Sequence, residues 1–552
     1  MGLLFLCGSL TPSLLPRIPA VQGTLSGVSL AVGYGLGKAL HWAWLVMGFS
    51  NLSGWVRQAL TWGLTLGLAG LTIFTFHRST IWQNSIRQRM EMPDVESGYS
   101  LLVAAIALGL ALVLILVARG VIWLMLVTSR PLNWVLPRPT AIGLGAVIAV
   151  MLVAGLVNGF IVQTALRAAD EVFATLDLAI EDDIAAPPHA FASGGPASVI
   201  DWDDIGTKGK AFLIDGPSQA EISALTGRPA MEPIRVYAGY RSGETFEERA
   251  ALALRDLIAL GGFERSVLIV ATPTGTGWLD PAAVQPIAYL HGGDLAIVAA
   301  QYAYVPSWMS IMVEPDRSRL AAQALFDAVY GHWTSLPEDN RPAFYLFGVS
   351  LGALGSEASA DLISIFADPI DGAFWSGPPF ASYVWASVVA RRNPGTPARL
   401  PEFRDGSVVR FMNQDGIATP AGAEWGPMRV IYLQYASDPM VFFSPSLAVR
   451  RPDWLSEERG RDVSPFFNWY PFVTFLQVGF DVPMATSPPS GYGHTYDALD
   501  YIEGWIAVTQ PADWSAGDTE KLKAFFAGFT ASASQSNGAT WSRQRSSSSP
   551  EL

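Results

Sequence analysis

A serine, an aspartate and a histidine in the C-terminal half of the chain have the types and the order that nucleophilic catalysis needs. The serine is Ser350, which lies between two glycines in GVSLG (348–352). The apolar run AFYLF (343–347) precedes this motif, and the small-residue run ALGSEASADLISIF (353–366) follows it. Flanking glycines permit the strained strand-to-helix turn that raises a serine hydroxyl above a sheet. The motif therefore predicts that Ser350 is a nucleophile, and the alternative is an ordinary turn serine that caps its helix.

The general base follows by elimination. The chain has six histidines, and His494 alone comes after Ser350. It lies in SGYGHTYD (490–497), a glycine-rich segment near the end of the part expected to fold. Where the chain order is serine, acid and then histidine, such a histidine takes the proton of the serine. We therefore expect His494 to be the base.

The acid is expected just after the strand that precedes the histidine. RVIYLQYA (429–436) is such a strand, and Asp438 comes two residues after it. A carboxylate there would accept a hydrogen bond from the histidine ring, fix its tautomer and stabilise the imidazolium. The rivals are Asp371, Asp405, Asp415 and Asp481. We prefer Asp438, because even Asp481, the nearest to the histidine in sequence, follows an aromatic segment rather than a clear strand.

An oxyanion hole is the third requirement, and it needs backbone N–H donors from two places. One expected donor is the N–H of Leu351, directly after the nucleophile. The second is expected where the strand 267–271 opens into a glycine-rich loop, with Thr274 and Gly275 as candidates. Losing one such donor typically costs about 3 to 4 kcal/mol of activation free energy. The alternative interpretation of this loop is a plain glycine turn.

The elements that must position these residues form a regular alternation. Runs of strand type lie at 233–239, 266–272, 294–304, 343–348, 372–377 and 429–436, and helical patterns lie at 244–262 and 317–333. Apolar strands without alternation, separated by helices, indicate a parallel sheet that is buried on both faces. Ligands on such sheets collect at the carboxyl ends of the strands. The predicted fold class is therefore α/β, with a mostly parallel sheet and helices on both faces.

The N-terminal third of the 552-residue chain has a different composition. Residues 1–169 carry ten Lys and Arg against three Asp and Glu, a net charge of +7, which leaves −20 for the rest of the chain. Long apolar windows lie at 24–48, 58–76, 100–118 and 141–163, with a shorter one at 1–16. A helix that crosses a bilayer needs about 20 mostly apolar residues. We therefore expect an all-α transmembrane domain of four to five spans, and buried core helices of a soluble protein are the alternative.

These patterns divide the chain into four parts. We expect the transmembrane domain at 1–168, a connecting segment rich in Asp, Pro and Gly at 169–232, and the catalytic domain at 233–530. The polar, serine-rich tail 531–552 has too few apolar residues to fold. The distribution of arginines leans weakly toward a cytoplasmic catalytic domain, but one miscounted span reverses that preference. We therefore predict a multi-pass membrane protein, and the side of the membrane on which its catalytic domain lies is left open.

The composition of the chain also limits the kinds of molecule that it is expected to bind. The acidic C-terminal part would repel the phosphates of nucleic acid, so the expected partners are a bilayer and a lipid or other ester. Cys7 is the single cysteine, which excludes an intramolecular disulfide and a cysteine-rich metal site. The sequence contains no metal-ligand cluster and no phosphate-binding glycine loop. We therefore expect neither a metal nor a cofactor.

Five segments together resemble a known family. They are LTPSLLPR (10–17), ATPTGTGWLDP (271–281), FGVSLGALGSE (347–357), YASDPM (435–440) and GYGHTYD (491–497). With them the chain resembles the bacterial membrane-anchored α/β-hydrolase family, whose members join a multi-helix membrane domain to an α/β-hydrolase domain. The resemblance covers nearly the whole chain except the serine-rich tail. It implies a hydrolase fold with a Ser350–Asp438–His494 triad, and it names no substrate.

Two aromatic segments are candidates for an acyl pocket. They are YAYVPSWMSIMV (302–313) and SPFFNWYPFVTFLQVGF (464–480), the second lying between acid and base. The candidate substrate-binding residues are Trp278, Trp308, Phe467 and Trp469. Such surfaces can act as a lid or dip into a membrane, and ordinary core packing is an equal alternative.

The predicted activity is cleavage of an ester or thioester, with a lipid ester favoured, through an acyl-enzyme on the serine. Two alternatives stay open. The same triad can pass the acyl group to an alcohol, which would make the protein an acyltransferase, or the domain is a non-catalytic lipid-binding or scaffolding module. A transporter is disfavoured, because the apolar windows lack paired broken helices and intramembrane carboxylates.

Overall fold

The computed structural model describes residues 1–48, 54–134, 184–305, 309–311, 316–360 and 365–535, with a few further positions between 137 and 152. The chain divides into two compact units. Unit 1 consists of Met1–Glu171 and Phe443–Met484, and unit 2 consists of Val172–Phe442 and Ala485–Leu552. We call Phe443–Met484 the insertion, because it interrupts unit 2 in sequence and folds with the N-terminal helices.

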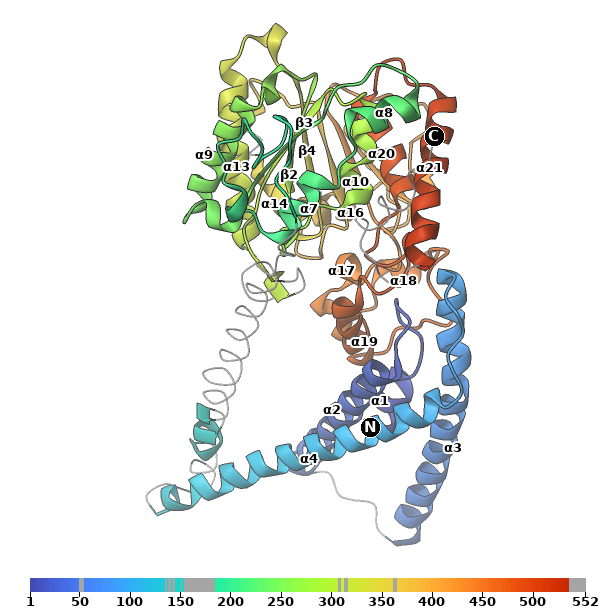
Figure 1. Ribbon diagram of the computed structural model, residues 1–552. Helices are drawn as coiled ribbons and strands as arrows, with labels where there is room; N and C mark the ends of the chain where they lie inside the picture. Colours follow the sequence, from blue (N-terminus) through green and yellow to red (C-terminus); the bar gives the residue numbers. More distant parts are fainter. Residues whose placement is uncertain are drawn as a thin grey trace. The chain divides into compact units, whose positions relative to one another are not determined.

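Unit 2 is built around an eight-stranded sheet (Figure 1). The strands are β1 (Ile234–Ala238), β2 (Val267–Thr272), β3 (Leu295–Ala300), β4 (Ala343–Val349), β5 (Gly372–Ser376), β6 (Val409–Asn413), β7 (Gly416–Ile417) and β8 (Arg429–Leu433). Their order across the sheet is β1-β3-β2-β4-β5-β8-β6-β7. Neighbours are parallel except for the short β6–β7 pair, which is antiparallel.

The strand β4 lies inside the sheet and is buried on both faces, as its unbroken apolar sequence requires. Phe344 packs toward one helical layer, where its ring meets Phe326 at 6.1 Å. Phe347 meets Trp505 at 5.5 Å, and these two contacts fall on opposite faces because side chains alternate along a strand. The register pairs Val349 with Ser376, so the carboxyl ends of β4 and β5 are adjacent.

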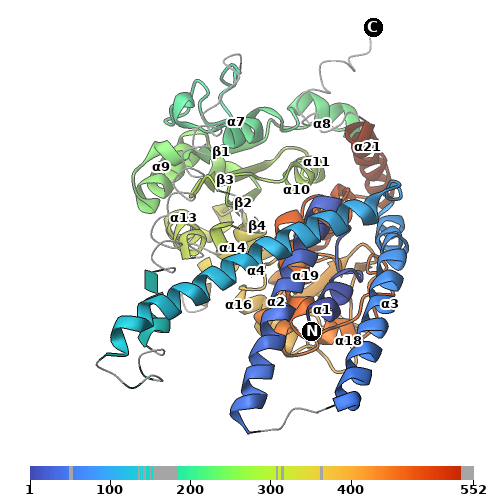
Figure 2. The ribbon, with the colours of Figure 1, turned by 90° about the horizontal axis from the view of Figure 1, so that it is seen from below.

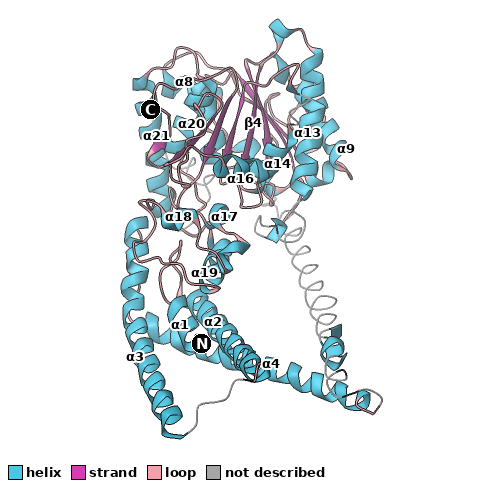
Figure 3. Ribbon diagram, turned by 180° about the vertical axis from the view of Figure 1, so that it is seen from behind, coloured by secondary structure: helices cyan, strands magenta, loops and turns pink. Residues whose placement is uncertain are grey.

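Helices cover both faces of this sheet (Figure 3). One layer contains α9 (Phe246–Ala259), α13 (Asp316–Ser335) and α14 (Leu351–Ser359). The other contains α10 (Pro281–Val284), α11 (Pro286–Leu290), α20 (Ala498–Thr509) and α21 (Ala516–Gln535). Further helices of unit 2 are α7 (Thr207–Ile214), α8 (Gln219–Thr226), α16 (Tyr383–Ala390) and α17 (Pro439–Phe442).

The predicted α/β class and its mostly parallel sheet are confirmed, and all six predicted strands are present. Sequence analysis missed β6 and β7 at one edge. The strand β6 is short and carries Arg410 and Asn413, so its sequence VRFMN lacks the apolar run that marks the inner strands. Residues 169–183 of the predicted connecting segment, residues 153–168 of the predicted transmembrane domain and residues 536–552 of the predicted tail lie outside the described residues.

Among its described residues, unit 1 includes the first four N-terminal helices and two α-helices of the insertion. They are α1 (Gly2–Ser9), α2 (Pro19–Val46), α3 (Gly54–Arg87) and α4 (Tyr99–Leu132), followed by α18 (Asp453–Ser456) and α19 (Val473–Asp481). Helix α4 crosses α2 (Figure 2). The crossing needs small residues, because a Cβ on Gly23 would lie 2.6 Å from the Cβ of Ile106 and one on Gly27 would lie 2.9 Å from the carbonyl oxygen of Ala107.

Two helices of the described part are long and apolar enough to cross a membrane. They are Gly54–Met90 and Tyr99–Pro131, with mean hydropathies of 1.5 and 3.2. The prediction of four to five spans is therefore corrected to two candidates within the described residues. The window 24–48 falls in α2, where glycines, Lys38 and His41 interrupt the apolar sequence. The window 141–163 lies largely outside the described residues.

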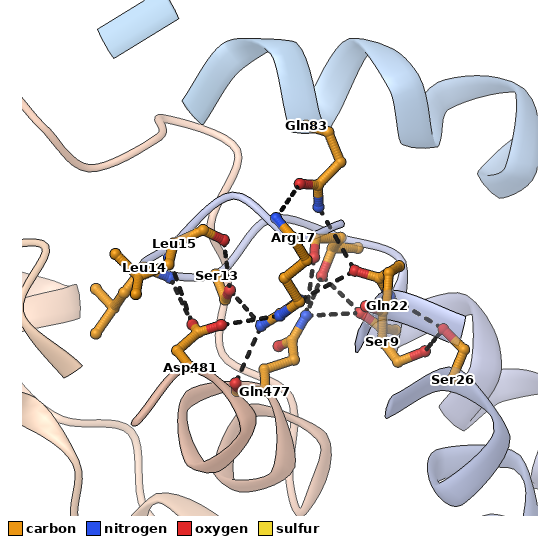
Figure 4. A network of polar contacts seen from close by, with 12 residues as sticks. Ser9, Ser13, Leu14, Leu15, Arg17, Gln22, Ser26, Gln83, Gln477 and Asp481 are labelled. Carbon is orange, nitrogen blue, oxygen red and sulfur yellow. Dashed lines mark hydrogen bonds and ion pairs between the residues drawn. The ribbon is translucent and has the colours of Figure 1, made fainter. Parts of the chain in front are cut away.

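A buried ion pair joins the N-terminal loop to the insertion inside unit 1 (Figure 4). Arg17 Nε donates to Asp481 Oδ1 at 2.8 Å, and both side chains are fully buried. The other carboxylate oxygen of Asp481 accepts the backbone N–H groups of Leu14 and Leu15 at 3.2 and 3.4 Å. Further acceptors for the guanidinium are Ser13, Gln22 and the carbonyl of Gln477. The charge of each partner is thus compensated by groups of the protein itself.

Helix α3 is hydrogen-bonded to the residues around the Arg17–Asp481 ion pair. Gln83 accepts the backbone N–H of Arg17 at 2.9 Å. Residues at and just beyond the end of α3 contact the insertion directly. Ser85 and Ser464 share a hydrogen bond of 2.7 Å, and Arg89, which follows α3, donates to the carbonyl of Arg461 at 3.0 Å. The insertion is therefore a structural part of the helical unit.

Candidate active site

Ser350 occupies the turn between β4 and α14, with φ 58° and ψ −126°. Residues with a side chain rarely adopt this conformation, and holding it typically costs about 1 to 3 kcal/mol. Both flanking glycines are sterically required. A Cβ on Gly348 would collide with the backbone of Gly352, and one on Gly352 would collide with the carbonyl oxygen of Thr272. The strand, strained turn and helix that the motif predicts are all present.

Asp438 and His494 are in direct contact. The Nδ1 atom of His494 lies 2.6 Å from Oδ2 of Asp438, and both side chains are buried. The other oxygen, Oδ1, accepts the backbone N–H of Met440 at 2.8 Å. A carboxylate held in this way requires the hydrogen of the imidazole on Nδ1, which leaves Nε2 as the proton acceptor. Asp438 lies in the segment between β8 and α17, directly before α17, and His494 lies in the loop before α20.

The rival acids have other partners. Asp371 accepts the backbone N–H of Phe344 at 2.7 Å, before β5 begins. Asp405 accepts from Ser407, and Asp415 lies 3.8 Å from Arg399. Asp481 belongs to unit 1, where it pairs with Arg17. Of the five predicted candidates, Asp438 is the one that the structure brings to the histidine.

The serine and the histidine border the same dipeptide at the end of β5. The backbone N–H of Ser350 donates to the carbonyl of Ser376 at 2.9 Å. A Cβ on Gly377, which has φ 56°, would lie 2.5 Å from Cε1 of His494. Within the described residues, Oγ of Ser350 and Nε2 of His494 are both buried and have no hydrogen-bond partner. Each unpaired buried polar atom costs stability, and a catalytic role is one of the reasons why proteins retain such atoms.

The predicted oxyanion loop lies beside the elbow, since a Cβ on Gly352 would contact the carbonyl groups of Thr272 and Pro273. The backbone N–H of one predicted donor already has an acceptor. The N–H of Thr274 donates to the carbonyl of Trp278 at 2.9 Å and so closes the loop on itself. Leu351 begins α14, where the first backbone N–H groups of a helix lack intrahelical acceptors. The roles of Leu351 and Gly275 stay predictions.

The predicted substrate-binding residues belong to different units of the chain, so each is described within its own unit. Trp278 lines a small cavity with Lys208, Phe212 and Arg235, and no residue of the predicted triad lines it. Trp308 lies outside the described residues.

Two of the predicted substrate-binding residues belong to the insertion. Phe467 is fully buried and its ring lies 5.8 Å from that of Trp454. The indole of Trp469 donates to the carbonyl of Leu447 at 2.8 Å. Both contacts are packing inside unit 1, which favours the core alternative for these two side chains.

Sequence analysis missed three residues that hold the acid and the base. The hydroxyl of Tyr496 donates to Oδ2 of Asp438 at 2.6 Å. The hydroxyl of Ser437 accepts the backbone N–H of Gly493 at 2.9 Å, and the carbonyl of Ala485 accepts that of His494 at 2.8 Å. Tyr496 lies in GYGHTYD and Ser437 lies in YASDPM, the segments that contain His494 and Asp438. Their closeness in sequence to the predicted triad is the signal from which a supporting role could have been predicted.

Two further carboxyl groups are buried near these elements. Burial raises the pKa of Asp280 to about 7, against the opposing effect of the Ala282 N–H that it accepts at 3.0 Å. Burial also raises the pKa of Glu357 in α14 to about 7, although the hydroxyl of Tyr432 donates to it at 2.9 Å. Both groups therefore change protonation near neutral pH. No group of three or more potential metal ligands occurs among the residues placed in the structure.

The parallel sheet, the strained serine turn and the acid–histidine pair at the strand ends are the features of an α/β-hydrolase. Comparison with known families agrees. Residues 234–522 match the Alpha/beta-hydrolase family, and residues 10–217 match the Alpha/beta-hydrolase family N-terminus. The chain therefore belongs to the alpha/beta-hydrolase family. No curated protein and no solved structure matches it. The bacterial origin and the membrane anchor that the resemblance implied stay predictions.

Proposed function

We propose that this protein is a membrane-anchored serine hydrolase that cleaves a carboxylic ester or thioester, with a lipid ester as the favoured substrate. The observation that carries the proposal is the 2.6 Å contact between His494 and Asp438, beside a strained serine. The unpaired Nε2 of the histidine and the unpaired Oγ of Ser350 border the same Ser376–Gly377 dipeptide.

The chemistry follows from these roles. Nε2 of His494 takes the proton of Ser350 while Oγ attacks the carbonyl carbon of the ester, and the new oxyanion accepts the N–H of Leu351. The imidazolium, stabilised by Asp438, then gives its proton to the leaving alcohol or thiol. Water attacks the acyl-serine with His494 again as base, which releases the acid and restores the serine hydroxyl. One ester and one water thus become one acid and one alcohol.

The membrane part of the proposal is supported by α3 and α4. Both helices expose large apolar side chains along most of their length, including Trp62, Leu66, Ile73, Leu108 and Leu116. Exposed apolar surface on this scale is stable in lipid and not in water. An anchor of two or more spans would also raise the local concentration of lipid esters at the catalytic unit.

Fluorophosphonate labelling of the full-length protein in detergent tests the proposal. We expect the parent to be labelled, because the probe phosphorylates an activated serine, and we expect Ser350→Ala to lose the label. Ser356→Ala is the matched control: this serine is also buried in α14, but its hydroxyl already accepts the indole N–H of Trp375 at 2.9 Å. A parent that is not labelled, or a Ser350→Ala variant that is, contradicts the proposal.

Extraction tests the anchor separately. Membranes from cells that express the full chain are washed with alkaline carbonate, which strips peripheral proteins. We expect the protein to stay with the bilayer. Release into the supernatant would contradict the anchor and leave the serine chemistry unaffected.

A further inference from the structure

The acid of the proposed triad has a second donor on the oxygen that meets the histidine. Oδ2 of Asp438 accepts both Nδ1–H of His494 and the hydroxyl of Tyr496, each at 2.6 Å. The other oxygen is taken by the backbone N–H of Met440. Asp438 therefore has three donors, and two of them share one atom.

Tyr496 is held in place by packing. Its side chain is buried, and its ring lies 4.6 Å from the ring of Tyr435 and 5.7 Å, edge to face, from that of His494. A Cβ on Gly377 would lie 2.8 Å from Cε2 of Tyr496 and 2.5 Å from Cε1 of His494, so one glycine makes room for both rings. The hydroxyl cannot leave Asp438 without disturbing this packing.

The shared oxygen has an electrostatic consequence. A short O–H···O⁻ hydrogen bond is strong and draws negative charge from the carboxylate toward the phenol. The carboxylate then stabilises the neighbouring imidazolium less than an unshared carboxylate would. Burial, and next the charge of Asp438, raise the pKa of Tyr496 well above its usual value, so the phenol stays a donor throughout the working pH range.

We propose that Tyr496 is a positioning residue, which shares Oδ2 of Asp438 with His494 and thereby sets the lowest pH at which His494 can accept the proton of Ser350. The inference rests on the proposed function and adds to it a control on the pH range of the reaction. Tyr496 acts through Asp438 and does not touch the substrate.

Other titratable groups lie near Asp438 and His494, and their effects on the pH profile must be distinguished from the effect of Tyr496. They are Asp280, Tyr435, Asp497, Asp500 and Tyr501. Asp280 is the important one, because its pKa is raised to about 7 by burial and it interacts electrostatically with His494. A pH profile of the Asp280→Asn variant identifies the contribution of this group, and the Tyr496 effect is measured in both backgrounds.

The test is the pH dependence of kcat/KM for a short-chain nitrophenyl ester. In Tyr496→Phe we expect the acidic limb to move to higher pH by about half a unit, because the freed carboxylate stabilises the imidazolium more, and kcat to fall about 3- to 10-fold through looser positioning. Tyr432→Phe is the matched control, since it removes a buried tyrosine hydroxyl from another buried carboxylate, that of Glu357. A Tyr496→Phe profile that superimposes on the parent profile overturns the inference.

A nearly isosteric replacement guards against misfolding. With 3-fluorotyrosine at position 496 the phenol is a stronger donor, so we expect the acidic limb to move to lower pH. A shift to higher pH, or none, overturns the inference.

A spectroscopic measurement keeps the inference testable if the proposed function fails. The proton on Nδ1 of His494 should give a low-field NMR signal, identified by its loss in His494→Gln. We expect that signal to move in Tyr496→Phe and stay in Tyr432→Phe. An unmoved signal contradicts the role of Tyr496, whereas failure of fluorophosphonate labelling contradicts the hydrolase proposal alone.

Discussion

Two buried groups of charged and polar side chains, one in each unit, differ in whether all of their polar atoms have partners. In unit 1, Arg17 and Asp481 compensate each other, and backbone and side-chain partners take up both ends of the pair. In unit 2, Asp438 is equally well satisfied, but the pair that it supports ends in two unpaired atoms, Nε2 of His494 and Oγ of Ser350.

We call Arg17, Asp481 and their partners the structural cluster, and Ser350, Asp438 and His494 the reactive cluster. A buried ion pair whose hydrogen bonds are complete has nothing left to offer a ligand, and its removal is felt as lost stability. A buried acceptor and donor that lack partners cost stability in the folded protein, and a strained φ at the serine adds to that cost. Proteins commonly retain such costs at functional sites, which supports the proposed role of unit 2.

The largest effect is expected from a substitution in the reactive cluster, and it is a loss of activity. His494→Gln keeps a hydrogen-bond donor near Asp438 but removes the base. We expect kcat/KM for a nitrophenyl ester to fall on the order of 10⁴- to 10⁶-fold, while the free energy of unfolding falls by no more than about 1 to 2 kcal/mol. Steady-state rates and denaturant unfolding in detergent measure the two quantities. Ester hydrolysis within tenfold of the parent would show that His494 is not the base.

The second-largest effect is expected from a substitution in the structural cluster, and it is a loss of stability. Arg17→Met leaves the carboxylate of Asp481 buried without its cation, and we expect the free energy of unfolding of unit 1 to fall by about 3 to 5 kcal/mol. Arg319→Gln, which removes an exposed ion pair with Asp316 in unit 2, is the control and should change the free energy of unfolding of that unit by less than about 1 kcal/mol. The double variant Arg17→Met with Asp481→Leu should recover most of the loss. A single variant as stable as the control would show that the ion pair does not hold the insertion.

The smallest effect concerns the carboxyl of Glu357. Because burial raises its pKa to about 7 in the folded protein, the folded state keeps a proton that the unfolded state has lost. The contribution of this group to stability therefore falls as the pH rises from about 4.5 to 7 and is constant above that range. Glu357→Gln should remove about 1 to 3 kcal/mol of this pH dependence, measured by denaturant unfolding at pH 5 and pH 8. An unchanged pH dependence would mean that Glu357 does not titrate in this range.

The proposed triad could be predicted because its signals are local or ordered along the chain. Ser350 stands between the glycines that its turn requires, Asp438 comes soon after a run of strand type, and elimination leaves His494. The parallel sheet was predictable for the same reason, because its strands are unbroken apolar runs. The helix–strand alternation supplied the remaining topology, apart from the polar edge strand β6.

The structural cluster could not be predicted, because its two halves are far apart in sequence. Asp481 was weighed only as a rival for the triad acid, and nothing in its surroundings points to Arg17, 464 residues earlier. The amide of Thr274 was assigned to the oxyanion hole because local sequence does not show that it closes its own loop. Phe467 was assigned to substrate for a similar reason, since an aromatic residue in a core and one in a pocket have the same sequence signature.

The distance along the chain between Arg17 and Asp481 also determines when the helical unit can be completed. At the usual speed of translation, about 5 to 20 residues per second, the ribosome needs about 20 to 90 seconds to make the intervening 464 residues. During that interval the loop between α1 and α2 holds a cation, Arg17, whose carboxylate partner has not yet been made. A messenger cut short before codon 481 would therefore yield a product that quality-control proteases recognise, even if every N-terminal helix were present.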